Sequence, residues 1–140
     1  MKKSDLKIDF MLLCDYASIS QEGKLSAMGI FEELRTLNNE AVLNRGFLVA
    51  AVSGKSATSY DLRIIAASTQ DEQQVLPQME MKINTGINGK SNLVIELVGV
   101  KFGEEGEYDF SIFLGREKIG TTKLRVIRLK TPDKPEKLTN

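Results

Sequence analysis

Apolar and polar residues alternate with a period of two over most of this chain, which is the pattern of β-strands with one buried face. The pattern is clearest in the last hairpin that it predicts, residues 106–129. Apolar residues occupy every second position from Tyr108 to Leu114, with acidic and small polar residues between them. Phe113 falls out of this phase, and we expect its ring on the outer face of the sheet.

The second strand of this hairpin contains a change of phase. Ile119 and Leu124 differ in parity, so a regular strand cannot bury both side chains. Gly120 lies between them and is the natural position for a β-bulge. The hairpin begins with Gly106-Glu107-Tyr108, which is typical of immunoglobulin-like sandwiches, where a buried tyrosine can bond to the backbone at a corner. An ordinary core tyrosine is the alternative for Tyr108, and neither interpretation implies catalysis.

Six further strands are predicted upstream, at residues 8–14, 25–34, 47–52, 60–66, 79–83 and 93–102. In the first of them, one face carries Ile8, Phe10, Leu12 and Cys14. Met11 and Leu13 make its other face apolar as well, so we expect this strand to be covered on both sides. Gly29 indicates a bulge or a close backbone approach in the second strand. Pro77 places the start of the strand at 79–83 at a sheet edge or a bulge. The continuously apolar third strand is expected to be central.

Four segments lie outside this pattern. Residues 1–7 are polar and are expected to be frayed. Residues 35–46 lose the period and predict a loop or one helical turn around residues 41–43. Asn88-Gly89 predicts a hairpin turn. Residues 130–140 are polar and contain two prolines, so we expect a flexible tail that joins no core.

Together these elements predict an all-β fold: an antiparallel β-sandwich of about eight strands, immunoglobulin-like, that forms a single domain over residues 1–129. A closed barrel with the same number of strands would have a similar pattern, and this alternative stays open. A chain of 140 residues has the usual size of one domain. No internal repeat and no second domain are predicted.

The composition narrows the range of functions. Lysine plus arginine and aspartate plus glutamate number 19 each, so no broad basic field is present to hold a phosphate backbone, and we expect no nucleic-acid partner. The chain has no histidine, which removes histidine-dependent nucleophilic catalysis and histidine-ligated zinc. Its one cysteine, Cys14, is expected to pack as a small hydrophobe in a reducing compartment rather than to act as a reactive thiol.

The first residues superficially resemble a lipoprotein signal, because two lysines precede an apolar run that ends at Cys14. The charges of Asp5, Lys7 and Asp9 leave that run shorter than the roughly 7–15 residues that a signal needs. No segment approaches the roughly 20 apolar residues of a membrane-spanning helix. We therefore expect a cytoplasmic protein with no membrane partner.

Two Gly-Lys-Ser triplets, at residues 54–56 and 89–91, could suggest phosphate-binding loops. Such a loop needs a glycine five positions before its second one, so that backbone amides can wrap the phosphate. Val49 and Asn84 occupy those positions, and no helix is predicted to follow either triplet. Both triplets are therefore predicted to be turns.

Acidic residues gather near the start of the last hairpin, at Glu104, Glu105, Glu107 and Asp109. Clustered carboxylates can bind Ca²⁺, which prefers six to eight oxygen ligands. Glu107 and Asp109 alternate outward along a strand, so solvated charge is the preferred interpretation and cation binding stays an open alternative. Met79 and Met81 are interpreted as core filling rather than ligands. We predict no catalytic, cofactor-binding or metal-binding residues and no cofactor.

Several segments resemble a family of small bacterial proteins known as a domain of unknown function. They are FMLLCDYA at 10–17, GKLSAMGIF at 23–31, FLVA at 47–50 and GEY at 106–108. Members of that family typically begin with LLADxAxxxxGKLNxLG and close with GxY followed by Asp-Gly. This chain departs from that pattern at Cys14, at Ser26-Ala27-Met28 and at Leu114-Gly115. The resemblance implies a bacterial, all-β, single-domain protein and brings no established activity or site.

The leading functional hypothesis is a noncatalytic binding or interaction module. It rests on the missing catalytic residues and on strands at sheet edges, which can pair with an unknown protein partner or with a second copy. A structural component of a larger or self-associating assembly is the alternative. A hydrolase based on carboxylates or on lysine and serine is the third hypothesis, and it predicts a concave pocket with paired carboxylates of shifted pKa.

Overall fold

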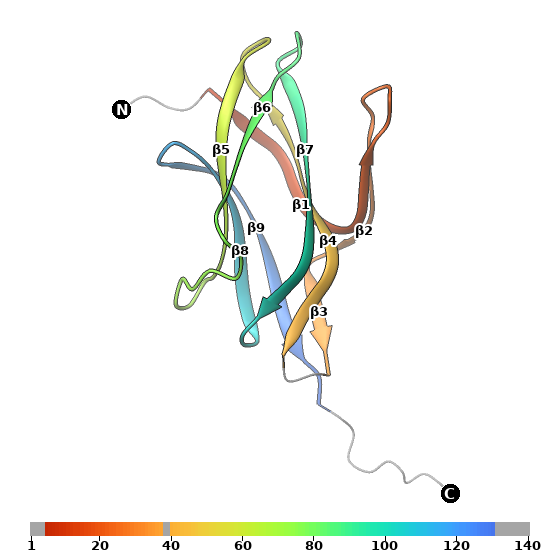
Figure 1. The fold of residues 1–140 in the computed structure, drawn as a ribbon, viewed down its shortest axis with the longest axis vertical. Coiled ribbons are helices and arrows are strands. Elements are labelled where there is room, and N and C mark those ends of the chain that lie inside the picture. The colour runs from red at the N-terminus through yellow and green to blue at the C-terminus, as the bar shows by residue number, and fades with distance from the viewer. Residues whose placement is uncertain (1–4, 38–39, 131–140) are drawn as a thin grey trace, which may run out of the picture.

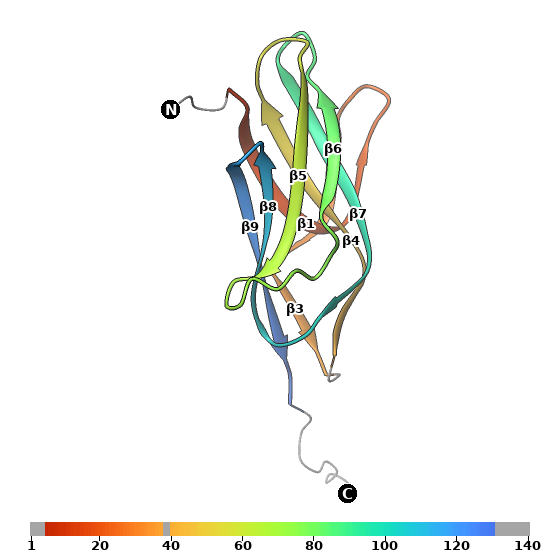
Figure 2. The same ribbon diagram turned by 60° about the vertical axis from the view of Figure 1, so that its left-hand side comes forward.

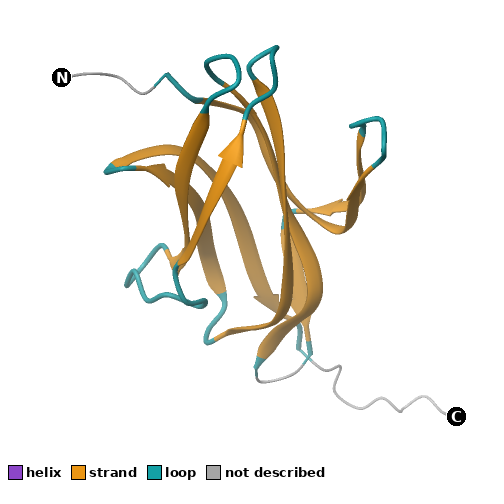
Figure 3. Cartoon of the chain, turned by 45° about the horizontal axis from the view of Figure 1, so that its top comes forward, coloured by secondary structure: helices purple, strands orange, loops and turns teal. Residues whose placement is uncertain are grey.

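The computed structural model describes residues 5–37 and 40–130, which form two β-sheets packed face to face (Figure 1). The strands are β1 (Lys7–Ile19), β2 (Leu25–Phe31), β3 (Glu33–Thr36), β4 (Ala41–Ser53), β5 (Ser59–Ser68), β6 (Met79–Asn84), β7 (Lys90–Phe102), β8 (Gly106–Leu114) and β9 (Glu117–Arg128). One sheet has the order β2-β1-β4-β7 and the other β3-β9-β8-β5-β6. The described ranges contain no helix (Figure 3), and hence none long and apolar enough to cross a membrane.

The strand order confirms the immunoglobulin-like sandwich. The order β1-β4-β7 opposite β9-β8-β5 reproduces the A-B-E and G-F-C orders of that fold. The two sheets lie on opposite sides of one core (Figure 2), so the described residues form a sandwich and not a closed barrel. Two details differ from the prediction: nine strands are present in the described ranges, and β3 pairs with β9 in parallel, whereas the other neighbours are antiparallel.

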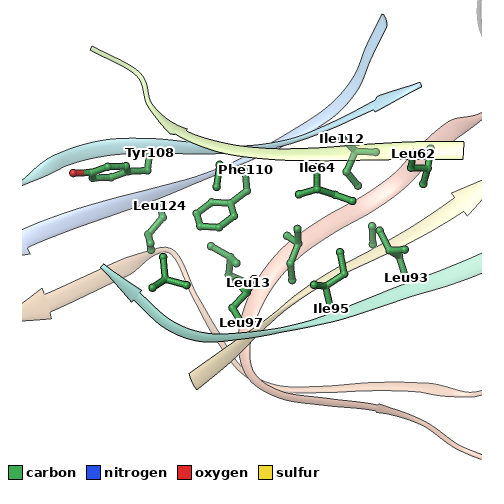
Figure 4. Close-up of a cluster of buried hydrophobic side chains, with 14 of the residues drawn as sticks. Leu13, Leu62, Ile64, Leu93, Ile95, Leu97, Tyr108, Phe110, Ile112 and Leu124 are labelled. Atoms are coloured by element: carbon green, nitrogen blue, oxygen red, sulfur yellow. The ribbon is translucent and has the colours of Figure 1, made fainter. Parts of the chain in front are cut away.

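The main core lies between the two sheets (Figure 4). The alternation predicted for β8 is confirmed, because Tyr108, Phe110 and Ile112 are buried. Phe113 lies on the outer face, where the charged groups of Arg63 and Lys118 are 4.9 and 6.0 Å from its ring centroid. Met79 and Met81 of β6 pack against this core as predicted, and β6 is an edge strand, as Pro77 indicated.

The bulge predicted at Gly120 is present. Ile112 pairs with Gly120 and Phe113 with Lys118, so Ile119 is an extra residue in β9. The shift lets Ile119 pack against the main core, in which Leu124 is fully buried. Glycine is required here because a Cβ at position 120 would lie 2.7 Å from a side-chain carbon of Ile8.

Tyr108 forms the predicted corner. Its hydroxyl donates to the Glu104 carbonyl at 2.5 Å and accepts from the Glu104 amide at 3.1 Å. Its ring meets Phe102 edge to face, with the ring centroids 4.9 Å apart. The side chain therefore ties the connection between β7 and β8 to the core, and the corner interpretation of Tyr108 is confirmed over that of an ordinary core tyrosine.

The strand predicted over residues 25–34 is wrong in one respect, because it is two strands in different sheets. β2 ends at Phe31, and β3 begins at Glu33 beside β9. Glu32 lies at the crossing, and its carbonyl accepts the amide of Arg125 at 2.9 Å. The Asn88-Gly89 turn likewise joins strands of different sheets, β6 and β7, instead of closing a hairpin.

The helical turn considered for residues 41–43 is absent, because β4 begins at Ala41. Ala41 and Leu43 are buried in the main core, which a strand allows by placing alternate side chains on one face. Within residues 35–46, the prediction for positions 38–39 lies outside the described residues.

The N-terminal prediction needs two corrections. Leu6 is 3% exposed and belongs to the main core, and Lys7 already starts β1, so residues 6–7 are not frayed. A register shift between Ile8 and Phe10 places these two side chains on opposite faces, contrary to the single face predicted from their parity. The predictions for residues 1–4 and for the tail from residue 131 lie outside the described residues.

Replacing Tyr108 with phenylalanine tests the corner. The substitution removes both hydrogen bonds to Glu104, and we expect the free energy of unfolding to fall by about 1–2 kcal/mol. The measurement is a urea titration followed by circular dichroism. Tyr16→Phe is the matched control; because Tyr16 is half-exposed, we expect a change within about 0.5 kcal/mol. Equal effects for the two substitutions would contradict the role of the corner.

Candidate interaction surface

β1 divides its length between two partner strands. Its first part, from Lys7 to Cys14, pairs with β4, and its second part, from Leu13 to Ile19, pairs with β2. Beyond Cys14 the β1–β2 hairpin leaves the sandwich and stands out on the outer side of the four-stranded sheet, at the right of Figure 1. β2 is therefore one of the two edge strands of that sheet.

A second apolar cluster lies on the outer face of the four-stranded sheet. Its buried members are Cys14, Ala17, Phe47 and Val49, and Leu12, Leu25, Ala27 and Val94 pack against them. Two of these residues, Leu25 and Ala27, come from the part of β2 next to the hairpin turn, so the hairpin contributes to this cluster. The prediction that the first strand is covered on both sides is thereby confirmed, since Leu13 faces the main core.

Aromatic and charged side chains cover the edge of this cluster. Tyr16 meets Phe47 edge to face, with ring centroids 5.7 Å apart and planes at 78°. The guanidinium of Arg45 lies 5.6 Å from the Phe47 centroid, and Glu96 holds it with a 2.7 Å ion pair. These contacts leave Phe47 only 7% exposed.

Cys14 is fully buried in this cluster. Its thiol donates a weak hydrogen bond to the Tyr16 carbonyl at 3.4 Å. Burial raises the pKa of the Cys14 thiol, because the thiolate would lose its hydration. The side chain therefore packs as a small hydrophobe, as predicted.

Gly29 sets the shape of the hairpin. Its φ is +70°, a conformation that strains any residue with a Cβ. A Cβ at this position would also collide with the carboxylate of Asp15. The backbone of Gly29 is therefore closely approached, as one of the two predicted alternatives required, and the group that approaches it is the side chain of Asp15; the register of β2 shows no bulge.

Large apolar side chains are exposed on one face of the hairpin. Met28 is 65% and Ile30 59% exposed, and Tyr16, which lies opposite Met28 on β1, is 49% exposed. These three residues are called the hairpin patch below. Single exposed apolar residues are common on proteins, whereas contiguous ones form the kind of patch found at contact surfaces, so the hairpin patch is the candidate surface.

The described part of the chain has four edge strands, β2, β7, β3 and β6. Edge strands usually carry charged residues that prevent pairing with other chains. Such residues are Glu33 and Arg35 in β3, Glu80 and Lys82 in β6, and Lys90, Glu96 and Lys101 in β7. β2 differs, because none of its seven residues is charged. Of these four edges, β2 is the one without this protection.

The two Gly-Lys-Ser triplets lie side by side. The triplet at residues 54–56 lies in the turn between β4 and β5, as predicted, whereas in the triplet at 89–91 only Gly89 belongs to a turn, because β7 begins at Lys90. The amide of Gly54 donates to the Gly89 carbonyl at 2.7 Å. Lys55 pairs with Asp5 at 3.2 Å, and the Lys90 ammonium lies 3.1 Å from the Ser53 hydroxyl. Each lysine is thus engaged by neighbouring protein groups.

The acidic residues near the last hairpin spread apart along it. Glu107 pairs with Arg125 at 3.4 Å and Asp109 with Lys123 at 2.9 Å, whereas Glu105 accepts the amide of Arg128 at 3.0 Å. Within residues 5–37 and 40–130, no three acidic or cysteine side chains are grouped so that they could hold a metal ion. A concavity of about 370 Å³ beside Tyr108 is lined in part by Glu104 and Glu105.

Sequence reasoning did not single out the hairpin patch. Met28 and Ile30 have the parity of a strand, but parity does not show which face is covered. The available signal was the uncharged run between Lys24 and Glu32, which is unusual for a strand at an edge. Its position at the edge follows only from the topology.

Comparisons with known proteins support the fold. The model of a family of unknown function (DUF6941) matches residues 9–127, and no curated protein matches the chain. The alkylpurine DNA glycosylase AlkC of Pseudomonas fluorescens, solved with DNA containing an abasic site analogue, matches 89% of this chain at 7% identity with a TM-score of 0.57. A β-glucosidase from Listeria innocua in complex with glucose matches 90% at 11% identity with a TM-score of 0.51.

The chain spans a small part of these two enzymes, 31% of the glycosylase and 16% of the glucosidase. An immunoglobulin-like protein from Pseudomonas aeruginosa matches 88% of this chain and is itself covered over 97% of its length, at 16% identity and a TM-score of 0.46. At these identities the similarities to the glycosylase and the glucosidase concern the fold alone.

The burial of Cys14 predicts slow reaction with a thiol reagent. In the native protein we expect dithionitrobenzoate to react at least about 100-fold more slowly than in urea, because access requires local unfolding. The matched control combines Cys14→Ala with Ile87→Cys, which moves the single thiol to a position whose native side chain is 89% exposed, and it should react rapidly. Rapid reaction of native Cys14 would contradict its burial.

Proposed function

This chain belongs to the family of unknown function DUF6941, and we propose that it is a noncatalytic interaction module whose strand β2 receives an extended strand from a protein partner. The observation that carries the proposal is the uncharged edge of β2 with the exposed side chains of Met28 and Ile30. We place the module in the cytoplasm, because its one cysteine suits a reducing compartment.

The backbone of β2 provides the affinity in this mode of binding. An edge strand has amide and carbonyl groups that point away from its one neighbour and can form a ladder with an added strand. Side chains at alternate positions then provide specificity, and here they are the apolar Met28 and Ile30. The partner strand is therefore expected to carry apolar residues at alternate positions.

The chemistry of the rest of the chain supports a noncatalytic role. Glu107 and Asp109 are engaged by Arg125 and Lys123, and the chain contains no histidine to move protons near neutral pH. Equal numbers of acidic and basic residues favour a protein partner over nucleic acid. A hydrolase would instead require two facing carboxylates that are free to act on a substrate.

Site-specific photo-crosslinking in the native cells tests this proposal. A photoreactive phenylalanine at position 28 is expected to give one or a few discrete adducts of defined mass. The matched control places the same group at position 87, where Ile87 is 89% exposed in the turn before β7, and we expect no discrete adduct there. Equal labelling at both positions, or none at position 28, would contradict a contact through β2.

A further inference from the structure

β2 and its two flanking residues have a self-complementary pattern. From Lys24 to Glu32, the even-numbered residues are exposed. This exposed row is basic at its start, apolar in its second half at Met28 and Ile30, and acidic at its end. An antiparallel copy of the row reverses this order, so each charged end lies opposite a group of the other sign.

Two-fold symmetry restricts the possible registers of such a pair. A two-fold axis perpendicular to the sheet keeps the same face of both copies on the same side. Residues directly opposite each other in an antiparallel pair point to the same side of the sheet. An even-numbered residue must therefore lie opposite an even-numbered residue of the second copy, and the axis must pass through a residue position.

The charges select one of these registers. With the axis at Met28, Lys24 lies opposite Glu32 of the second copy, and Met28 lies opposite its own equivalent. Moving the axis to Ala27 or Gly29 would instead place Lys24 opposite an apolar side chain, Ile30 or Leu34 respectively. The register about Met28 is thus the one that satisfies the charges and brings the apolar centres together.

Ion pairs within one copy do not compete with this pairing. The seven residues of β2 separate Lys24 from Glu32, a span of roughly 23 Å for an extended strand, so the two side chains cannot reach each other in one chain. Neither side chain takes part in the ion pairs formed within residues 5–37 and 40–130. The positive φ of Gly29 does not change the register of β2, because the pairs with β1 on either side of Gly29 follow one register from Phe31 to Leu25; only Gly29 and Asp15 are not paired.

We propose that the partner of β2 is a second copy of this chain, joined by an antiparallel β2–β2 ladder with Met28 on the two-fold axis. This inference rests on the proposed function and names the strand that β2 receives. The ladder joins two four-stranded sheets into one continuous sheet. Because one strand pair is expected to bury less than the roughly 1,600 Å² of a standard protein interface, we expect the dimer to dissociate on dilution.

Charge reversal at the two ends of β2 tests the register. Light scattering on a chromatography column, over a concentration series, should show a species of twice the 15.6 kDa of one chain. Lys24→Glu or Glu32→Lys alone creates two like-charge contacts across the axis, and each should raise the dimer dissociation constant by about tenfold. The double variant Lys24→Glu/Glu32→Lys restores both pairs and should return the constant to within about threefold of the wild type.

Substitution on the axis provides an independent readout. Met28→Lys places two ammonium groups opposite each other and should give a monomer at all concentrations of the series. Ile87→Lys is the matched control, because it introduces the same charge at an exposed apolar residue away from β2, and it should leave the dimer unchanged. Urea titrations of all variants, which are substituted at exposed positions, show whether the fold is retained.

The outcomes separate this inference from the proposed function. A dimer that Met28→Lys does not dissociate, or single and double charge variants with equal dissociation constants, would overturn the β2–β2 ladder. A wild-type monomer that still gives a discrete adduct with another protein at position 28 would overturn the second copy as partner and leave the interaction module standing. A monomer with no adduct at position 28 would overturn both.

Discussion

The four-stranded sheet has to bury apolar side chains on both of its faces, and the form of the hairpin follows from this constraint. Leu13 faces the core between the sheets, whereas Cys14 and Phe47 face outward. An apolar outer face left in water would cost roughly 25 cal/mol for each Å² exposed. The β1–β2 hairpin covers part of this face with Leu25 and Ala27. As a consequence the sheet gains β2 as an edge strand, and β2 has exposed residues of its own.

Most of the fold could be predicted from the sequence because the relevant signals are local. Alternation in β8, the phase change at Gly120 and the tyrosine at position 108 each reflect the environment of a few adjacent residues. The division of residues 25–34 between two sheets was not predictable, because both halves favour a strand. The residue at the crossing is Glu32, and neither it nor its two neighbours is a glycine or proline that would signal a break. The burial of Leu6 was missed because it depends on distant strands.

The candidate site was less predictable than the fold for a related reason. An edge strand and a central strand of equal length can have the same alternation, and their difference lies in which neighbours the topology provides. Gly29 was recognisable as a special position, but its neighbour Asp15 lies on another strand. The exposure of the Met28 side chain likewise depends on which parts of β2 the rest of the fold leaves uncovered, and no local sequence pattern encodes this.

The position of β2 in the fold explains how the chain can have an edge strand without charged residues and still keep its fold. The charged edges β3, β6 and β7 belong to the parts of the sheets that enclose the main core. β2 stands apart from the sandwich on the hairpin (Figure 1), so an added strand there meets Met28 and Ile30 but leaves the packing between the sheets unchanged. Charged residues thus lie on the three edges of the sandwich, and the uncharged edge is the one on the hairpin. This distribution of charge is expected when one edge serves for binding.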